Sequence, residues 1–260
     1  MAKKKKNVKR KINKSRFIIL ISLLLIIVFS ILFIFKNTFG TTRTIKTNEN
    51  GNNTNEASKK ESEIEHLSLD NEKTSDKFKI LIDPGHGGSD LGTEGVNGVL
   101  EKDVCLNIGK KVAGELSQYD DLEVILTRSE DTYISAEDRI KMANSQGVDA
   151  VVSIDANAQS NSNLAHGIET YYQANGMADS EKLAKTIQDT ISLYLNSKNR
   201  GIYPSNLQIL KESDMPAVLV EVGFITNEKE AEKLNNNSYQ DRMAEGIAQG
   251  ILRYIDDTKS

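Results

Sequence analysis

Short apolar runs alternate with amphipathic helical patterns through residues 76–257, and this alternation limits the possible folds more than any other feature of the chain. The predicted strands are Phe78–Ile82, Leu122–Thr127, Ala150–Ile154, Ile168–Tyr172, Leu207–Leu210 and Ala217–Val220. The predicted helices are Glu101–Tyr119, Ala136–Gln146, Ser180–Ser197, Glu228–Leu234 and Ser238–Tyr254. Strands that alternate with helices predict a single α/β domain in which helices flank a roughly six-stranded mixed sheet.

Two of the predicted strands suit the centre of that sheet. Ala150–Ile154 and Ala217–Val220 are almost continuously apolar, which is typical of strands buried on both faces. The carboxyl ends of parallel strands share one edge of a sheet, and ligands bind in the crevice outside that edge. The polar residues that directly follow the predicted strands are therefore the first candidates for a functional site.

His86 is the first of these candidates, in the stretch Asp-Pro-Gly-His-Gly-Gly at residues 83–88. The proline has no N–H and ends the strand, and the glycines permit a tight loop around the histidine. This loop would present a metal ligand or a catalytic base just past the carboxyl end of the first strand. A loop histidine is also often only a solvated residue, so the partners of His86 decide between these interpretations.

Three acidic residues are predicted to lie near His86. Asp155 follows the third strand, Glu221 follows the last apolar run, and Glu101 begins the first long helix. Two of them also have a structural interpretation, Glu101 as a first-turn acid favoured by the helix dipole and Asp155 as a turn residue. Glu221 lies in an apolar stretch, where an unpaired carboxylate is costly. It therefore indicates a metal, a cation or a raised pKa, and a raised pKa suits a general base.

The N-terminal 36 residues predict a membrane anchor. Residues 3–16 contain nine Lys and Arg and no acid, and Phe17–Phe35 is a run of 19 uncharged, almost wholly apolar residues. That length crosses a hydrocarbon core, and the basic flank places residues 1–16 in the cytoplasm. We expect one transmembrane helix at residues 17–36, an uncleaved signal anchor, because no small-residue cleavage site follows it. A cleaved signal peptide is the alternative.

Residues 37–75 predict a disordered linker, because they are polar and nearly lack large apolar side chains. Residues 1–47 hold twelve of the 33 Lys and Arg residues and none of the 37 Asp and Glu residues, which leaves a formal charge of −16 for the rest. An acidic outer domain argues against nucleic acid as a partner. The single cysteine, Cys105, excludes an intramolecular disulfide and is expected to be a small buried side chain in a helix.

Several motifs together resemble the zinc-dependent N-acetylmuramoyl-L-alanine amidases. They are Asp-Pro-Gly-His-Gly-Gly at 83–88, Glu-Lys-Asp at 101–103, Leu-Thr-Arg at 126–128, Arg139 with Ala143 and Asn144, Val-Ser-Ile at 152–154, and the stretch Pro216–Asn227. The resemblance covers residues 77–255, in order and at matching spacings. It implies a peptidoglycan amidase, which hydrolyses the amide between the lactyl group of N-acetylmuramic acid and the L-alanine of the stem peptide.

The resemblance also implies roles for four residues. In the family, two histidines and a glutamate hold the zinc ion, and a later glutamate is the catalytic base. At the matching positions of this chain, His86, Glu101 and Asp155 are the implied metal ligands, and Glu221 is the implied general base for metal-activated water. Asp155 departs from the family's pattern, which has a histidine there. The other domain histidine, His166, is expected to be a surface residue rather than a replacement ligand.

The aspartate leaves two interpretations open. Zinc accepts a carboxylate oxygen at nearly the same distance as an imidazole nitrogen, but aspartate is shorter than histidine and its oxygen can fall short of the ion. Two carboxylates also neutralise a divalent ion, which weakens its effect on bound water and favours a harder ion such as Mn²⁺. The chain is then either a working metal-dependent amidase or a weak or inactive amidase-like protein that binds peptidoglycan or regulates its turnover.

Together with the N-terminal segment, the resemblance implies a single-pass protein of the bacterial cell membrane, with an amidase domain at residues 76–257 outside the cytoplasm. Its expected partners are peptidoglycan and the membrane, and an activating protein is a further alternative. Small anchored members of the family include those that trim spore cortex during sporulation, and this architecture resembles theirs. Cell separation and general wall turnover are the other interpretations.

Overall fold

The computed structural model describes residues 77–160, 163–174 and 178–259. The elements are β1 (Phe78–Pro84), η1 (Val96–Gly98), α2 (Glu101–Leu116), β2 (Leu122–Leu126), α3 (Ala136–Gln146), β3 (Ala150–Asn157), β4 (Ile168–Gln173), α4 (Ala178–Leu195), β5 (Asn199–Ser205), α5 (Gln208–Lys211), β6 (Ala217–Phe224), α6 (Glu228–Leu234) and α7 (Asn237–Lys259). The predicted membrane segment and linker lie outside the described residues. Within the described ranges, no helix combines the length and the apolar composition that a membrane crossing needs.

The six strands form one mixed sheet in the order β2-β1-β3-β6-β4-β5. β1 pairs in parallel with β2 and β3, β3 pairs in parallel with β6, and β4 pairs in parallel with β5. β4 and β6 are antiparallel. The predicted single α/β domain with a six-stranded mixed sheet is confirmed, and the two strands expected at the centre, β3 and β6, are neighbours there.

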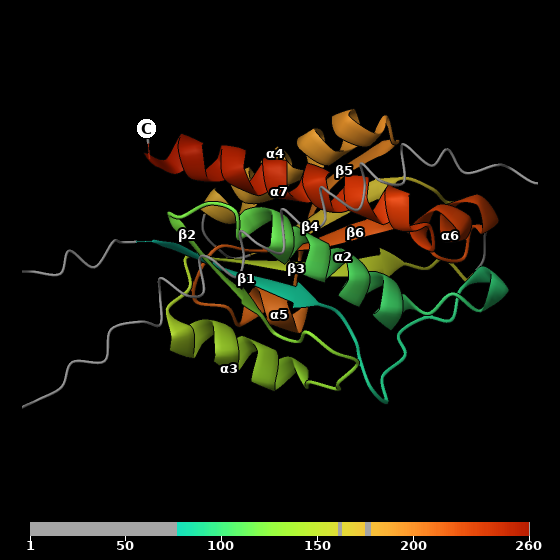
Figure 1. The fold of residues 1–260 in the computed structure, drawn as a ribbon, viewed down its shortest axis with the longest axis horizontal. Helices are drawn as coiled ribbons and strands as arrows, with labels where there is room; N and C mark the ends of the chain where they lie inside the picture. Colours follow the sequence, from blue (N-terminus) through green and yellow to red (C-terminus); the bar gives the residue numbers. More distant parts are fainter. Residues whose placement is uncertain (1–76, 161–162, 175–177, 260) are drawn as a thin grey trace, which may run out of the picture. The chain divides into compact units, whose positions relative to one another are not determined.

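Helices cover both faces of the sheet (Figure 1). One face carries α2, α4 and α7, and the other carries α3 and α5. Because successive side chains of a strand point to opposite faces, Ile82 and Val152 join the core under the first group of helices, whereas Leu81 and Val151 join the smaller core under the second. Asp83, Ser153 and Asp155 follow this second set on the same face, at the carboxyl ends of the strands beside the candidate site.

The strands β1, β3 and β6 run further than their apolar runs. Asp83, Asp155 and Glu221 therefore belong to the strands rather than to the loops that follow them. In the register of the sheet, Asp83 lies opposite Ser153 and Asp155 lies opposite Glu221. The parallel carboxyl ends thus bring these acidic residues to one edge of the sheet, as the sequence predicts.

One strand assignment is wrong, and one strand at the far edge of the sheet was not predicted. Leu207–Leu210, predicted as a strand, overlaps the helix α5, and the sixth strand is instead β5. A short apolar run fits a strand or a buried helical turn equally well, and here Ile209 and Leu210 pack into the core of the α3 and α5 face. The pattern does not reveal β5, because this half-exposed edge strand contains Pro204, which a sheet tolerates only at its edge.

Candidate metal centre

The loop after β1 presents His86 in a left-handed backbone conformation, with φ of 58°. L residues rarely adopt this conformation, so neighbouring contacts have to hold the loop. Arg128 donates from Nε to the Pro84 carbonyl at 3.0 Å and from Nη2 to the Gly85 carbonyl at 2.6 Å. Arg139 donates from Nη2 to the His86 carbonyl at 2.7 Å. Two buried arginines therefore hold the loop carbonyls and fix where the imidazole lies.

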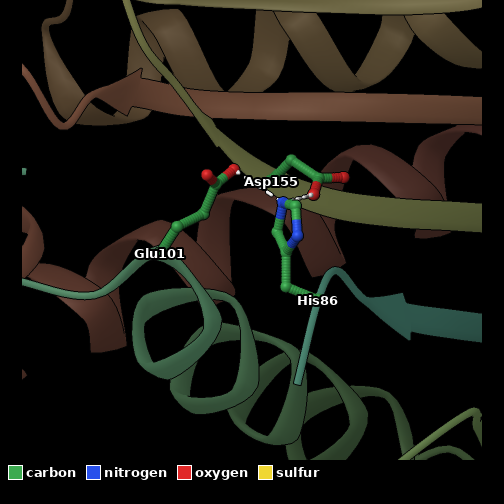
Figure 2. A group of neighbouring side chains, drawn as sticks. All are labelled: His86, Glu101 and Asp155. Atoms are coloured by element: carbon green, nitrogen blue, oxygen red, sulfur yellow. Dashed lines mark ion pairs between the residues drawn. The ribbon is translucent and has the colours of Figure 1, made fainter. Parts of the chain in front are cut away.

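The two nitrogens of the His86 ring have different surroundings. Nδ1 lies 2.9 Å from Oδ2 of Asp90, and an ionised carboxylate accepts hydrogen bonds only, so Nδ1 is the donor. Nε2 faces Oε1 of Glu101 at 3.3 Å and Oδ1 of Asp155 at 3.6 Å (Figure 2). A carboxylate behind one nitrogen and an open position at the other is the usual arrangement of a metal-binding histidine. Asp90 was not predicted as a site residue, although a carboxylate four residues after a loop histidine is a signal for this contact.

Glu101 reaches the site from the first turn of α2. Its side chain is 8% exposed. Oε2 accepts the backbone N–H of Thr93 at 2.7 Å, and Oε1 accepts the backbone N–H of Ala156 at 3.1 Å. The carboxylate is therefore anchored at both oxygens and turned toward His86 (Figure 2). The interpretation of Glu101 as only a first-turn acid does not explain these contacts.

Asp155 projects from β3 toward the same point. Ser153 donates its hydroxyl to Oδ2 of Asp155 at 3.1 Å and is also 3.1 Å from Oδ2 of Asp83. Oδ1 of Asp155 is thereby left to face His86. The carboxylate packs so closely against Gly85 that a Cβ at position 85 would lie 1.9 Å from Oδ1. Glycine at this position is what lets the shorter side chain of aspartate occupy the ligand place.

Asp83 completes the support of this part of the site. Its side chain is 3% exposed, and Oδ1 accepts hydrogen bonds from Thr127 at 2.6 Å and from Nη1 of Arg139 at 2.5 Å. A buried carboxylate without such donors would be strongly destabilising. Arg139 thus fixes Asp83, and Asp83 contacts Ser153, which in turn holds Asp155.

The three candidate ligands fit a small divalent ion. One donor atom from each of His86, Glu101 and Asp155 lies within 4.8 Å of the other two. Ligands about 2.0–2.1 Å from a tetrahedral centre are roughly 3.3 Å apart, close to the 3.3 Å and 3.6 Å measured from Nε2 of His86. Imidazole and carboxylate donors are those that zinc accepts. Oδ1 of Asp155 lies with the other donors despite the shorter side chain.

Glu221 lies beside this group on β6, between two other acids. It is opposite Asp155 on one side and opposite Glu169 of β4 on the other. Its Oε2 is buried and has no hydrogen-bond partner among the described residues. Burial, followed by the charges of Asp155 and Glu101, holds the pKa of Glu221 well above its usual range. A carboxyl group in this condition readily takes and returns a proton.

The same proximity perturbs the candidate ligands. Hydrogen bonding to Glu101 raises the pKa of His86 from 6.5 to about 9, against the lowering effect of burial. Burial and the charge of Glu101 raise the pKa of Asp155 from 3.8 to about 7. For Glu101, burial acts to raise the pKa, but hydrogen bonds from His86 and Thr93 lower it overall. Asp155 and Glu221 are therefore the carboxyl groups whose protonated form is most favoured by burial and by their acidic neighbours.

A cavity of about 380 Å³ adjoins the group on the α3 and α5 face. Its lining includes the polar residues Asp83, Ser153 and Asp155 together with Tyr133 and Leu207. Tyr133 is 55% exposed and Leu207 is 44% exposed. A cavity lined by exposed apolar side chains and a few polar groups is typical of a ligand cleft.

His166 and Cys105 lie outside this group. The ring of His166 is exposed, with Nδ1 3.0 Å from the Leu164 carbonyl, and it is absent from the candidate ligand cluster found among the described residues. His166 therefore does not replace the second histidine. Cys105 is fully buried in α2, as expected for a small core side chain, and burial raises the pKa of its thiol.

Comparison with known proteins gives consistent matches. A family model described as N-acetylmuramoyl-L-alanine amidase matches residues 80–253. The amidase LytC of Bacillus subtilis (strain 168) is 42% identical over 176 residues, which are 67% of this chain and 35% of LytC. The sporulation-specific N-acetylmuramoyl-L-alanine amidase of the same strain is 36% identical over 174 residues, which are 66% of each chain.

The fold has equally similar solved relatives. The crystal structure of an N-acetylmuramoyl-L-alanine amidase from Clostridium difficile 630 is 47% identical, with a TM-score of 0.68. The match covers 70% of this chain and 98% of that one. By contrast, this chain spans only 35% of the length of LytC, so the match to LytC concerns one part of that protein.

Proposed function

This chain belongs to the family of N-acetylmuramoyl-L-alanine amidases, and on that premise we propose that it is a peptidoglycan amidase. The bond cut is the amide between the lactyl group of N-acetylmuramic acid and the L-alanine of the stem peptide. The observation that carries the proposal is the convergence of His86, Glu101 and Asp155, with Glu221 opposite Asp155 in the sheet. A metal-dependent hydrolase needs such a ligand set with a general base beside it.

The metal-ligand residues and Glu221 have different roles in the reaction. A divalent ion bound by His86, Glu101 and Asp155 would supply a Lewis acid for water and for the amide carbonyl. Glu221 takes a proton from the attacking water through Oε2, the oxygen that has no other partner among the described residues. The water oxygen bonds to the carbonyl carbon, and the C–N bond breaks. Glu221 then returns the proton to the nitrogen of L-alanine.

We propose Zn²⁺ as the resident ion, one per domain. The separations between donor atoms and their chemistry support this choice. The second carboxylate brings the formal charge of ion and ligands to zero, so the ion acidifies water less than in a site with one carboxylate. A harder ion such as Mn²⁺ is therefore the competitor to test.

We also propose that the domain acts outside the cytoplasm on peptidoglycan near the membrane. The basic residues 1–16, the apolar residues 17–36 and the polar residues 37–75 support an anchor and a tether. Similarity to an amidase named as sporulation-specific supports a role in spore cortex, with general wall turnover as the alternative. Dependence on an activating protein stays a prediction.

The decisive experiment uses the purified full-length chain with and without Asp155→His and Glu221→Gln. Metal content is measured by elemental analysis, and hydrolysis is measured as new L-alanine amino termini released from peptidoglycan. We expect about one divalent ion per chain in all three proteins. We expect hydrolysis by the wild type and by Asp155→His, and none detectable from Glu221→Gln.

The opposite outcome defines the rival function. A wild-type chain that holds no metal and cuts nothing, but gains both properties with Asp155→His, is an amidase-like protein that binds or regulates. Binding of the wild type to insoluble peptidoglycan then measures what function it retains. A wild-type chain that cuts peptidoglycan at a different bond contradicts the assigned substrate bond.

A further inference from the structure

A break in the register of the sheet directs one arginine toward the site. Ile168 pairs with Asn199, but the next residue of β4, Glu169, pairs with Gly201, so Arg200 is an extra residue in β5. Gly201 has φ of 105°, which a residue with a side chain rarely adopts. A bulge of this kind re-aims a side chain, and bulges are common next to active sites. Arg200 thereby reaches the face of the sheet that carries Glu169.

The guanidinium of Arg200 is held on two sides. Nε donates to Oε2 of Glu169 at 2.5 Å, and the group lies over the ring of Phe224 with its carbon 4.6 Å from the ring centre. Glu169 is itself fixed, because its Oε1 accepts from Asn157 at 2.6 Å and from the hydroxyl of Tyr171 at 2.8 Å. A preorganised guanidinium loses little entropy when it binds a ligand.

The other edge of the guanidinium is available. The side chain of Arg200 is 28% exposed, whereas that of Glu169 is 6% exposed. Neither Nη1 nor Nη2 of Arg200 has a hydrogen bond or ion pair with any described residue. Two parallel N–H groups in this geometry match the two oxygens of a carboxylate.

The guanidinium of Arg200 contacts the cross-strand neighbour of the candidate base. Glu169 is the cross-strand neighbour of Glu221, and side chains of such neighbours begin about 5 Å apart. Arg200 therefore lies two strands beyond the candidate base, on the side away from His86, and its guanidinium reaches back to Glu169 of the intervening strand β4. The cavity lined by His86 and Asp155 lies on the opposite side of Glu221.

We propose that Arg200 binds a free carboxylate of the substrate's peptide. The inference rests on the proposed function and adds the orientation of the substrate. In an N-acetylmuramoyl peptide the lactyl carboxyl is part of the amide to be cut, so every free carboxylate belongs to the peptide. The peptide then lies over β6, β4 and β5, and the muramoyl group lies toward the cavity beside His86.

The test compares two N-acetylmuramoyl dipeptides whose C-termini are blocked. In one, the residue after L-alanine carries a free side-chain carboxylate, and in the other this group is a carboxamide. We expect the wild type to prefer the carboxylate by about tenfold to a hundredfold in kcat/KM, mostly through KM, because the hydrogen bond is charge-assisted. Arg200→Lys should remove most of the preference, because it keeps the charge beside Glu169 but loses the fork.

Binding is measured separately, so that the result does not depend on turnover. The full-length Glu221→Gln chain, supplied with Zn²⁺, is titrated calorimetrically with each dipeptide, with and without Arg200→Lys. A carboxylate preference that Arg200→Lys removes supports the inference. Equal binding of the two dipeptides, or no binding, overturns it, and so does a preference that survives the substitution.

A matched arginine separates recognition from general effects on the fold. Arg242 of α7 also lies over an aromatic ring, with its guanidinium carbon 5.9 Å from the ring centre of Tyr194. Arg242→Lys should leave the preference unchanged. If Arg200 only neutralises Glu169, Arg200→Lys leaves the preference between the two dipeptides unchanged, and the inference fails. Absence of hydrolysis by the wild type refutes the proposed function instead, while the calorimetric comparison still decides the role of Arg200.

Discussion

The buried carboxylates on the two sides of the site differ in whether they have hydrogen-bond donors and a cationic partner. On the β1 side, Asp83 is almost fully buried and accepts hydrogen bonds from Thr127 and Arg139. On the β3 and β6 side, Asp155 and Glu221 lie opposite each other, and Oε2 of Glu221 has no hydrogen-bond partner among the described residues. A buried carboxylate thus stabilises the fold at Asp83, whereas at Asp155 and Glu221 two neighbouring carboxyl groups lack a cationic partner of this kind within the described part of the chain.

This difference separates residues that hold the fold from residues that act. Burial without a partner is costly, so an arrangement that keeps Asp155 and Glu221 side by side lowers stability in the metal-free chain. A divalent ion and a proton are the two species that relieve the excess charge. The β1 side, by contrast, is complete without either, because Asp83 pairs with Arg139 and Arg128 donates to backbone carbonyls. Variants of the two sides should therefore behave differently.

The largest expected effect is on catalysis, from Glu221→Gln. The substitution keeps the size of the side chain but removes the proton acceptor, so kcat should fall by about 10²- to 10⁴-fold. Because it also removes a buried charge, it should raise the melting temperature of the metal-free chain. Steady-state rates and thermal unfolding in EDTA measure the two effects. Activity within threefold of wild type would refute the role of Glu221 as the base.

On the β1 side, Arg139→Met should instead damage stability. It leaves Asp83 buried without its ion-pair partner and frees the carbonyl of His86. Breaking a buried pair by removing one member costs about 3–5 kcal/mol, to be measured by urea unfolding. Arg253→Met is the matched control on α7, where the guanidinium donates to Thr190 at a long 3.4 Å, and it should cost under about 1 kcal/mol. If Arg139→Met and Arg253→Met lowered the unfolding free energy equally, the structural role assigned to the pair of Asp83 and Arg139 would be wrong.

The dependence of stability on pH is a third test of the comparison. The pKa of Asp155 is raised from 3.8 to about 7 by burial and Glu101, and that of His86 from 6.5 to about 9 by Glu101. A group with a raised folded-state pKa stabilises the fold below its unfolded pKa, and this contribution is lost as pH rises through the folded value. The unfolding free energy of the metal-free chain should therefore fall between about pH 4 and pH 9, by roughly 2 kcal/mol or more.

Thermal unfolding in EDTA across this range measures the effect. Asp155→Asn cannot ionise, so its stability should fall less steeply between pH 4 and pH 7 than that of the wild type. Saturating Zn²⁺ should remove most of the dependence above pH 7, because the ion binds the deprotonated ligands. A wild-type profile that is flat, or that rises toward pH 9, would show that these charges do not govern stability.

Strand and helix periodicity predicted the parts of the fold that repeat regularly. β3 and β6 are long apolar runs, so both their positions and their place at the sheet centre followed from sequence. β5 contains Gly201 and Pro204 and packs only one face, so its sequence lacks the alternation that identifies a strand. The reversal of β4 relative to β6 depends on packing around the whole sheet, which no local pattern encodes.

The site was predictable to the extent that strand ends determine it. His86 and Glu221 follow apolar runs, and their convergence follows from parallel strands. The fit of Asp155 depends on how closely the backbone at Gly85 approaches, which spacing does not reveal. Arg200 was missed for a similar reason, because its direction results from a bulge rather than from the alternation of β5. Contacts that depend on a close backbone approach or a bulge could therefore be identified only from the structure.

The smallest expected effect tests the link between the two sides, which is Ser153. Its hydroxyl is 3.1 Å from Oδ2 of Asp83 and from Oδ2 of Asp155. Ser153→Ala should leave the Asp83 pair intact but free Asp155 to rotate, which lowers Zn²⁺ affinity by about tenfold in a competition titration. Ser192→Ala, a buried serine of α4 on the opposite face, is the control and should leave affinity unchanged. Unaltered affinity in Ser153→Ala would mean that Gly85 alone determines where Oδ1 of Asp155 lies.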